Sequence, residues 1–370
     1  MLSVPQKMLA VIFGGRSGEH VVSLRSAESI MKAVDRERYR VIQVGITREG
    51  RWITGDSAWQ VLRGERPLSE AAEAVLLTDP SRPGLLSRPA EGAAWTFQPL
   101  DLAFPVLHGP FGEDGTVQGL LELAGIPYVG SGVLASAVSM DKVVMKILFQ
   151  KYQLPVAPYL YFYRWDWKRR KRDLAGRIAA ELGYPCFVKP ANLGSSVGIS
   201  RVIDEEFFSA AVDEALLYDD KVVVEKAISG REIECSVIGD LEPRASRPGE
   251  IIPCNEFYDY RAKYLDDRSL LIVPVELGEQ LEEKIKELAC AAFKAVEASG
   301  LARVDFFVNT DEGQIVINEI NTIPGFTSIS MYPKLWEVSG ISYGELINQL
   351  LALAESRFQR RRALRTAPPE

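Results

Sequence analysis

Apolar residues in the chain follow two patterns: continuous or alternating runs typical of strands, and the three-to-four-residue spacing typical of amphipathic helices. The first run, Met8–Phe13, is continuously apolar and ends in Gly14 and Gly15. A helical pattern over Ser23–Val34 follows, with Ser23 as the expected N-cap. The chain is therefore predicted to open with a strand, a glycine turn and a helix.

The same alternation of strands and helices continues to about residue 135. It predicts strands at Arg40–Ile46, Leu100–Val106 and Ile126–Val129, a helix at Thr116–Ala124 stopped by Gly125, and an irregular segment at Trp52–Glu91. Strands that alternate with helices form parallel sheets with helices packed on their faces. We therefore expect a doubly wound α/β domain over residues 1–135.

The pattern changes in the rest of the chain, where strands follow one another through short turns. It predicts helices at 139–151, Asp204–Leu217, Glu279–Ser299 (closed by Gly300) and Glu345–Arg362, two strands around a Gly/Ser turn within Cys186–Ser200, a strand at Lys221–Ile228 and a loop at Phe257–Arg268. Strands joined by tight turns form antiparallel sheets. The fold class expected is α/β at the N-terminus and α+β beyond it.

Two alternating runs near the C-terminus, Ala302–Asn309 and Gln314–Ile320, flank a short acidic loop that ends in Gly313. A glycine that can adopt the left-handed conformation suits the last position of such a loop. The two runs therefore predict an antiparallel β-hairpin.

Symmetry of this hairpin about Glu312 places Asp305 opposite Glu319. It also places Arg303 opposite Asn321, and the two-residue repeat of a strand puts all four side chains on one face. Two carboxylates about 5 Å apart repel by about 3 kcal/mol, a conflict that a bound cation removes. Oxygen ligands favour Mg²⁺ or Mn²⁺ over zinc. The alternatives are a charged, solvent-facing sheet or a register shifted by one residue.

Two lysines are candidates for binding an anion. Lys142 lies in the first turn of a predicted helix, where the helix dipole disfavours a cation unless an anionic ligand is near. Lys189 precedes a turn in which Ser195 and Ser196 supply hydroxyl donors between glycines. The alternatives are a surface lysine and a flexible hairpin tip, because the sequence is not a Walker A motif.

Three glutamates are further candidates, each with a structural alternative. Glu19 follows the first glycine turn, where it would also simply complement a helix dipole. Glu225 and Glu232 flank a tight turn and are candidates for binding an adenosine. A carboxylate can accept hydrogen bonds from ribose hydroxyls, and the backbone at a strand edge can recognise the base. Exposed glutamates on an edge strand are the alternative.

Composition narrows the class of protein. The chain has 370 residues, 47% hydrophobic and 25% charged, and the longest apolar runs fall short of the roughly 18 residues of a membrane span. Met1–Lys7 lacks a basic region followed by an apolar core, so we expect no signal peptide and a cytoplasmic location. A net charge of −7 argues against general nucleic-acid binding, and the basic cluster Trp165–Arg172 is typical of a solvated helix start.

Cysteine and histidine are sparse. The four cysteines are scattered without a CxxC pair, which predicts reduced thiols rather than a disulfide framework or a zinc site. His20 and His108 are the only histidines, too few for a histidine-rich metal site.

Several motifs, each weak alone, occur together and in order along nearly the whole chain. They are GGRSGEHVVSL, HGPFGEDGT, GSGVLASAVSMDK, KPANLGSSVGIS, VVVEKAISGRE, FYDYRAKY, RVDFF and NEINTIPGFTSIS. In this combination the chain resembles the D-alanine:D-alanine ligases of the ATP-grasp superfamily. The resemblance implies an N-terminal α/β domain (1–135), a central lid domain (136–226) and a C-terminal catalytic domain (227–370), with ATP between two antiparallel sheets.

The resemblance also implies which residues bind ATP and metal. Lys142, Lys189 and Lys263 contact the phosphates, with Ser195 and Ser196 in the turn that covers them. Glu225 and the backbone of Lys226, Ala227 and Ile228 recognise adenine, and Glu232 holds the ribose. Asp305, Glu319 and Asn321 bind two Mg²⁺ or Mn²⁺ ions.

The implied reaction phosphorylates the carboxylate of one D-alanine, after which the amine of a second D-alanine displaces phosphate. Glu19 holds the first ammonium, His108 lies near the first D-alanine, and Ser330 binds the second carboxylate. Arg303 and the Gly325 amide stabilise the oxyanion, and Ser195 and Tyr264 tie a loop shut over the reactants through Glu19.

Two rival functions remain open: a ligase that uses D-lactate or another amine, and a non-catalytic nucleotide-binding protein. The FYDYRAKY motif is that of the dipeptide ligases, which favours D-alanyl-D-alanine as a peptidoglycan precursor. The resemblance further implies a homodimer, with no nucleic-acid partner and no membrane insertion.

Overall fold

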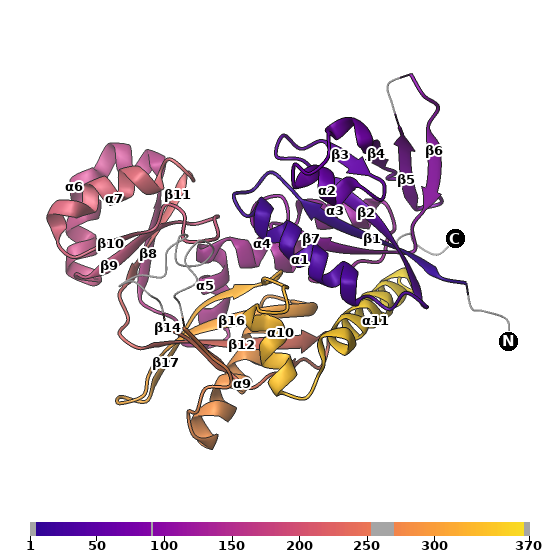
Figure 1. The fold of residues 1–370 in the computed structure, drawn as a ribbon. Helices are drawn as coiled ribbons and strands as arrows, with labels where there is room; N and C mark the ends of the chain where they lie inside the picture. The colour runs from indigo at the N-terminus through magenta and orange to yellow at the C-terminus, as the bar shows by residue number, and fades with distance from the viewer. Residues whose placement is uncertain (1–4, 90–91, 253–269, 366–370) are drawn as a thin grey trace.

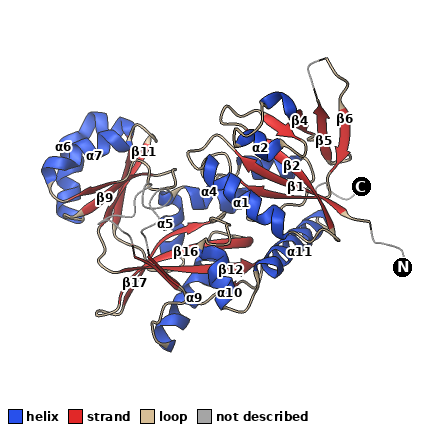
Figure 2. Ribbon diagram, in the orientation of Figure 1, coloured by secondary structure: helices blue, strands red, loops and turns tan. Residues whose placement is uncertain are grey.

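The computed structural model describes residues 5–89, 92–252 and 270–365, and these residues fold around three β-sheets (Figure 1). The sheets follow the chain: a seven-stranded sheet, a four-stranded sheet and a six-stranded sheet. Each has helices packed on it (Figure 2).

The N-terminal sheet is built around the first predicted strand. This strand, β1 (Lys7–Gly14), lies between β2 (Tyr39–Ile46) and β7 (Leu102–Val106) and is parallel to both. Its last six residues are buried, as expected for a central parallel strand covered on both faces. Two helices, α1 (His20–Ala33) and α3 (Thr116–Leu123), follow β1 and β7 in the chain.

The segment Trp52–Glu91 was expected to be irregular, but its described residues, 52–89, form regular elements, so that prediction is wrong. It forms β3 (Trp52–Thr54), α2 (Ala58–Leu62), a 3-10 turn (Leu68–Glu70), β4 (Ala72–Leu76) and β5 (Gly84–Arg88), and β6 (Thr96–Pro99) follows. These strands extend the sheet in the order β6-β5-β4-β3-β2 with antiparallel pairing. The strands are short and half-exposed, so their apolar signal is weak between the Pro and Gly residues that separate them.

Two further expectations fail at this end of the chain. Ser23 is not an N-cap: α1 begins at His20 behind Glu19, and the buried Ser23 hydroxyl accepts from the Gly14 amide. Residues 126–129 form only an isolated bridge, through Tyr128 to Ala103, instead of a full strand.

The central sheet has the order β10-β9-β11-β8 and is antiparallel throughout. Its strands are β8 (Tyr159–Tyr163), β9 (Cys186–Pro190), β10 (Ser200–Val202) and β11 (Lys221–Lys226). Helices α6 (Arg164–Glu181) and α7 (Glu205–Ala215) pack on its outer face (Figure 2). Helices α4 (Val133–Met140) and α5 (Lys142–Lys151) connect this sheet to the N-terminal one.

The C-terminal sheet has the order β15-β14-β12-β16-β17, with β13 paired to β12. Its strands are β12 (Arg231–Gly239), β13 (Arg244–Ala245), β14 (Gly249–Ile252), β15 (Leu270–Ile272), β16 (Gly300–Asn309) and β17 (Gln314–Asn321). Its helices are α9 (Glu279–Ala295), α10 (Met331–Val338) and α11 (Tyr343–Arg362). Helix α9 ends at Ala295, four residues before the predicted Ser299, and Gly300 begins β16 instead of closing the helix.

The register of the β16–β17 hairpin is the one predicted where it bears charged residues. Asp305 pairs with Glu319, and Arg303 pairs with Asn321. A β-bulge lies next to them, because Phe306 pairs with Ile317 and leaves Asn318 as an extra residue in β17. Without this extra residue Glu319 would lie opposite Val304 on the buried face, so the bulge aims Glu319 at Asp305.

The last helix packs against the first sheet. Leu346, Leu350 and Leu351 of α11 belong to one hydrophobic core with Leu9 and Val11 of β1. Buried Arg357 of α11 also donates hydrogen bonds to the carbonyl oxygens of Gly130 and Tyr128. The two ends of the chain therefore stabilise each other.

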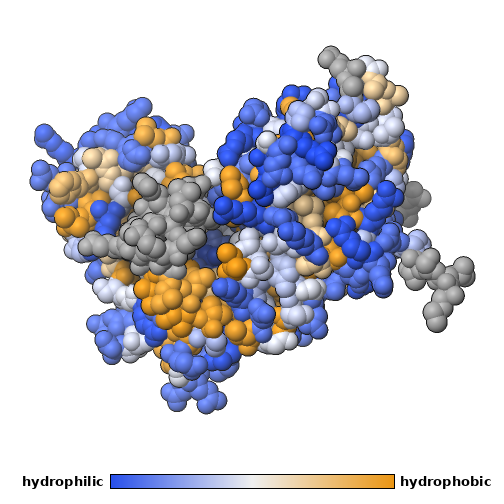
Figure 3. All heavy atoms as spheres, in the orientation of Figure 1, coloured by the Kyte–Doolittle hydropathy of each residue, from blue (hydrophilic) through white to orange (hydrophobic). Residues whose placement is uncertain are grey.

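No helix within the described ranges is long and apolar enough to cross a membrane. Hydrophilic residues cover most of the face shown in Figure 3, with an apolar area near β14. Cys186, Cys235 and Cys290 are free thiols, as predicted; Cys254 lies outside the described residues.

Candidate active site

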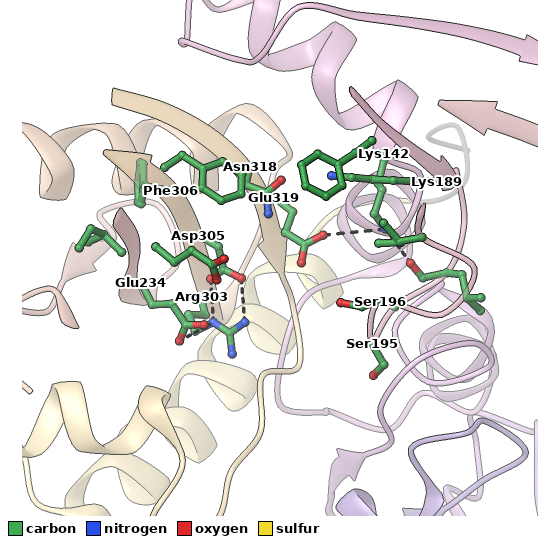
Figure 4. A pocket seen from close by; sticks show the side chains of 17 residues that line it. Lys142, Lys189, Ser195, Ser196, Glu234, Arg303, Asp305, Phe306, Asn318 and Glu319 are labelled. Atoms are coloured by element: carbon green, nitrogen blue, oxygen red, sulfur yellow. Dashed lines mark hydrogen bonds and ion pairs between the residues drawn. The ribbon is translucent and has the colours of Figure 1, made fainter. Parts of the chain in front are cut away.

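A cleft lies between the Gly/Ser turn of the central sheet and the face of the C-terminal sheet (Figure 4). Water-sized molecules can occupy about 90 Å³ within it. Its lining includes these predicted residues: Lys142, Lys189, Ser195, Ser196, Glu232, Arg303, Asp305 and Glu319. The cleft therefore brings together candidates from five separate sequence motifs.

The position of Lys142 follows from the helix that carries it. Asp141 caps α5 by accepting hydrogen bonds from the amides of Val143 and Val144, at 3.0 and 3.1 Å. The ammonium of Lys142 donates to the Leu193 carbonyl at 2.6 Å and lies 3.8 Å from the Glu319 carboxylate. This places a cation between the Gly/Ser turn and the acidic face of the C-terminal sheet.

The Glu225 carboxylate is buried between two lysines. Its Oε2 atom lies 3.1 Å from the ammonium of Lys189 and 3.3 Å from that of Lys146. Burial disfavours the charged form, but the two ammonium groups outweigh it and hold the pKa of Glu225 below its ordinary value. The Oε1 atom is buried and has no hydrogen-bond partner among the described residues.

The backbone after Glu225 is partly engaged within the protein. The amides of Lys226 and Ala227 donate to the carbonyls of Pro158 and Pro185, at 2.9 and 3.1 Å. These two amides are occupied, so a base could contact the segment 226–228 only through its carbonyl oxygens and the Ile228 amide. The segment joins β11 to β12, which belong to different sheets, so it crosses between the two walls of the cleft.

Three carboxylates form a row across the C-terminal sheet. Glu234 of β12 pairs with Asp305 of β16, which pairs with Glu319 of β17. Arg303 lies beside the row: its guanidinium donates to both oxygens of Asp305 at 2.7 Å and lies 3.1 Å from Glu234 (Figure 4). The adjacent acids raise the pKa of Arg303 well above its ordinary value, although burial opposes them.

The donor set at this row suits a hard divalent cation. Asp305 and Glu319 supply carboxylate oxygens, and the Asn321 amide lies next to them, donating through Nδ2 to Asp305 at 3.0 Å. The described part of the chain holds no cluster of three or more His, Cys, Asp or Glu side chains able to bind a metal. Two carboxylates and an amide oxygen are too few to fill a coordination shell alone. They fit an ion such as Mg²⁺, which takes its remaining oxygen ligands from water and substrate phosphates.

The Gly/Ser turn has an unusual backbone. Ser195 and Ser196 have positive φ angles of 55° and 57°, a conformation that few non-glycine residues adopt. A Cβ atom added to Gly194 would lie 3.5 Å from the Glu19 carboxylate. The turn of the central sheet therefore closely approaches the first loop of the N-terminal domain.

Glu19 and His108 form a second cluster at the end of the N-terminal sheet. Ser17 donates to the His108 carbonyl at 2.6 Å and accepts from the Glu19 amide at 3.2 Å. Gly109 has a φ of +73°, and a Cβ there would come within 2.7 Å of a Glu19 carboxylate oxygen. Only glycine fits this approach.

The histidine in this cluster has a defined tautomer. Its Nδ1 donates to the Ile323 carbonyl at 2.8 Å, so its Nε2 accepts from the Ser26 hydroxyl at 3.2 Å. Burial lowers the pKa of His108, and this favours the neutral ring.

Glu113 was not a candidate from the sequence. It binds the amide of Ile323, the residue whose carbonyl binds His108. Its carboxylate accepts from the amides of Gly109 at 2.6 Å and Ile323 at 3.2 Å. Burial, followed by repulsion from Glu19, raises the pKa of Glu113 to about 8. The residue ties the loop after β7 to the loop after β17.

Gly325 and Ser330 lie together in the loop after β17. A Cβ on Gly325 would lie 3.2 Å from the Ser330 hydroxyl, which accepts from the Thr327 amide at 3.1 Å. Ser330 is the N-cap residue of α10, where the helix dipole favours an anion. The predicted residues Lys263 and Tyr264 lie outside the described residues.

Sequence reasoning missed three further charged residues at the site: Lys146, Glu113 and Glu234. Lys146 lies one helical turn after Lys142, so helical spacing would have placed both on one face. Glu234 shares a face with Glu232, and only its pairing with Asp305 shows that it belongs to the acidic row.

Models of known families match both halves of the chain. The "D-ala D-ala ligase N-terminus" model matches residues 8–131, and the "D-ala D-ala ligase C-terminus" model matches residues 148–352. The chain belongs to the D-alanine–D-alanine ligase family. The predicted family resemblance is therefore confirmed.

Individual members of this ligase family are similar over nearly the whole chain. The D-alanine–D-alanine ligase of Heliobacterium modesticaldum is 50% identical over 355 residues, which cover 96% of each chain. That of Natranaerobius thermophilus is 49% identical over 357 residues, covering 95% of each.

Solved structures of ligases in this family share the fold. The VanG D-Ala:D-Ser ligase from Enterococcus faecalis has a TM-score of 0.85 and 37% identity, covering 95% of this chain and 100% of its own. The D-alanine-D-alanine ligase from Coxiella burnetii has a TM-score of 0.83 and 36% identity, covering 97% of each. The ATP-grasp fold class is confirmed, with an N-terminal sheet that is mixed rather than wholly parallel.

Proposed function

We propose that this ATP-dependent ligase joins two D-alanines into D-alanyl-D-alanine for peptidoglycan precursor synthesis. The observation that carries the proposal is the cleft in which Lys142 and Lys189 face the Asp305–Glu319 pair. Phosphoryl transfer needs cations around the phosphates and a carboxylate-bound metal opposite them. Family membership supplies the identity of the substrates.

ATP binds with its phosphates between Lys142, Lys189 and the Ser195–Ser196 turn. The exocyclic amine of adenine donates to the buried Oε1 of Glu225, which otherwise lacks a partner among the described residues. Glu232 holds the ribose, and the Lys226–Ile228 backbone contributes to base recognition. Lys263, outside the described residues, completes the phosphate contacts.

Asp305, Glu319 and Asn321 hold two Mg²⁺ or Mn²⁺ ions. When bound, these ions neutralise charge on the phosphates and supply the positive field that phosphoryl transfer requires. The carboxylates keep cationic partners in Arg303 and Lys142, so the row is charged and ordered before a metal binds.

The D-alanine subsites lie along the line from Glu19 to Ser330. Glu19 binds the first ammonium beside neutral His108. A carboxylate oxygen of the first D-alanine attacks the γ-phosphorus and releases ADP. The amine of the second D-alanine, whose carboxylate lies at Ser330 and the N-terminus of α10, then attacks the acyl carbon and displaces phosphate.

Two groups stabilise the tetrahedral intermediate of this second step. Arg303 and the Gly325 amide donate to its oxyanion, which they surround in a site shielded from water. Ser195, Glu19 and Tyr264 tie the covering loop shut, with Tyr264 outside the described residues.

We further propose the three domains 1–135, 136–226 and 227–370, a homodimer and a cytoplasmic location. The net charge of −7 disfavours nucleic acid as a partner. The rival amine or hydroxyl substrates, including D-lactate and the D-serine named in the Enterococcus relative, differ only at the second subsite.

The test is phosphate release from ATP by the purified chain. We expect release to require both D-alanine and Mg²⁺ or Mn²⁺, and the product to have the mass of the dipeptide. A protein that binds ATP but releases no phosphate with D-alanine at any pH from 6 to 9 would contradict the enzymatic function. When D-alanine is mixed with D-lactate or D-serine, a product near neutral pH that is mainly the depsipeptide or D-alanyl-D-serine would favour the rival ligases.

A further inference from the structure

The mechanism above does not use Lys146, although its side chain is one of the largest that are fully buried in the described structure. It is 0% exposed. Burying an ammonium group costs several kcal/mol unless the group is paired and hydrogen-bonded. Burial accordingly lowers the pKa of Lys146, while Glu225 opposes that shift. The contacts that offset this cost are those with Glu225 and Asn318.

Lys146 contacts both walls of the cleft. Its ammonium lies 3.3 Å from Oε2 of Glu225, on the central sheet, and donates to the carbonyl of Asn318 at 3.2 Å, on the C-terminal sheet. It lies one turn after Lys142 on α5, the helix that runs between the two sheets. One ammonium therefore connects the two elements that hold the nucleotide.

The contact with Glu225 fixes the carboxylate that faces the base. Oε2 is shared between Lys146 and Lys189, and Oε1 is left to accept from a ligand. Lys189 is the more exposed of the two and lines the cleft, so a bound phosphate draws on its charge. Lys146 then remains as the fixed cation that keeps Glu225 ionised and oriented.

The contact with Asn318 fixes the β-bulge. Asn318 is the extra residue of β17, and the bulge turns Glu319 toward Asp305. A bulged residue lies outside the regular ladder, so a side-chain donor to its carbonyl stabilises the distortion. Lys146 therefore acts on the metal-facing carboxylate through the backbone that precedes it.

We propose that Lys146 is a positioning residue that sets both the base-recognising carboxylate of Glu225 and the metal-facing carboxylate of Glu319. This proposal rests on the nucleotide and metal roles proposed above. It predicts that a single side chain controls base selectivity and divalent-metal dependence together.

The test compares Lys146→Met with Lys151→Met, a matched change at an exposed lysine of the same helix. ADP and IDP are titrated by calorimetry, each in EDTA and in Mg²⁺. IDP lacks the exocyclic amine, so the ratio of the two affinities measures recognition by Glu225. Loss of one charge-assisted hydrogen bond changes an affinity by about tenfold.

For Lys146→Met we expect the preference for ADP over IDP to fall by about tenfold and the Mg²⁺ concentration for half-maximal ADP binding to rise severalfold. Lys151→Met should match the unchanged protein in both. If Lys146→Met does not fold, the same two measurements on Lys146→Gln, which keeps a donor without the charge, decide the matter.

Three other outcomes contradict the proposal. Equal weakening of ADP and IDP with unchanged Mg²⁺ dependence would show a purely structural role. Unchanged affinities would show that Lys146 does not position either carboxylate. An unchanged protein that binds neither nucleotide would overturn the proposed nucleotide site itself, and with it this inference.

Discussion

Three acidic side chains at the cleft lie against cations before any ligand binds. Asp305 is held by Arg303, Glu319 lies near Lys142, and Glu225 is shared by two lysines. Charges paired in this way cost less to bury than unpaired charges. In the proposed reaction, phosphates and metal ions exchange partners with groups that are already in place, which is the arrangement that electrostatic catalysis requires.

The metal site can be tested at single residues. We expect Asp305→Asn and Glu319→Gln to raise the Mg²⁺ concentration for half-maximal activity at least tenfold, because each removes an anionic oxygen ligand. Glu312→Gln, at the exposed turn of the same hairpin, is the control and should leave it unchanged. Thermal unfolding should shift by only a few degrees in all three. If Asp305→Asn and Glu319→Gln unfold to the same degree as their response to Mg²⁺ weakens, the pair instead has a structural role.

The raised pKa of Glu113 predicts a pH-dependent stability. Between pH 4.5, the ordinary value, and pH 8 the folded protein holds a proton on Glu113 that the unfolded chain has released. The free energy of unfolding therefore falls as the pH rises through this window and levels off above it. The Glu113 side chain is partly exposed to solvent. We therefore expect the free energy of unfolding to fall by about 1–2 kcal/mol, less than the full pKa shift would give.

The variant Glu113→Gln does not titrate and lacks this loss. Its melting temperature, measured relative to the unchanged protein, should therefore rise by several degrees from pH 5 to pH 9. A temperature difference that stays constant over this range would show that Glu113 titrates normally in the folded protein.

Residues with local signals could be predicted from the sequence, and residues with distant partners could not. The Asp305–Glu319 pairing followed from counting along one hairpin. Glu113 and Lys146 become informative only when Ile323 and Asn318 are brought to them, from about 200 residues away in the chain. The local sequence does not distinguish Glu113 from an ordinary surface charge, and for Lys146 it offers only the four-residue spacing from Lys142.

At the scale of elements, α5 is the helix that positions Lys142, the lysine proposed to contact the phosphates. Its N-cap residue, Asp141, does not line the cleft. It orders the first turn of the helix, which starts at Lys142. We expect Asp141→Ala to cost about 1 kcal/mol of stability and to weaken ATP binding severalfold, as measured by thermal unfolding and calorimetry.

Asp204→Ala is the control for loss of a cap, since Asp204 caps α7 by accepting from the Glu206 amide at 3.0 Å. Asp141 also forms an ion pair with Lys221, so Asp204→Ala should lower stability less than Asp141→Ala does and leave ATP affinity unchanged. Equal effects of the two substitutions on ATP affinity would show that general destabilisation, and not the placement of Lys142, is responsible.

Elements with strong periodicity were predicted well, and short edge strands were not. The buried run of β1 and the amphipathic α11 stood out because each carries a long, regular pattern. Strands β3 to β6 have three to five residues each and alternate only partly, so the antiparallel half of the first sheet was not expected. The β16–β17 register was correct at Asp305 because the unforeseen bulge offsets a turn that is one residue longer than assumed.

At the scale of the whole molecule, the central and C-terminal sheets enclose the cleft, the first loop of the N-terminal domain approaches it at Gly194, and α11 and β1 share one core. The order of the motifs predicted the fold class, because their combination occurs along nearly the entire chain. The shared core of α11 and β1 was not predicted, since an amphipathic helix shows which face is buried and not what covers it. This packing fixes the first loop, with Glu19, relative to the loop that carries Ser330.

The most direct test of the proposed reaction follows one oxygen atom. The purified chain is supplied with ATP, Mg²⁺ and D-alanine labelled with ¹⁸O in its carboxylate, and both phosphate and peptide are analysed by mass spectrometry. Transfer through an acyl phosphate moves one labelled oxygen from the first D-alanine to each phosphate released, and yields D-alanyl-D-alanine lacking that oxygen. Unlabelled phosphate, or a product in which the label is fully retained, would contradict the account.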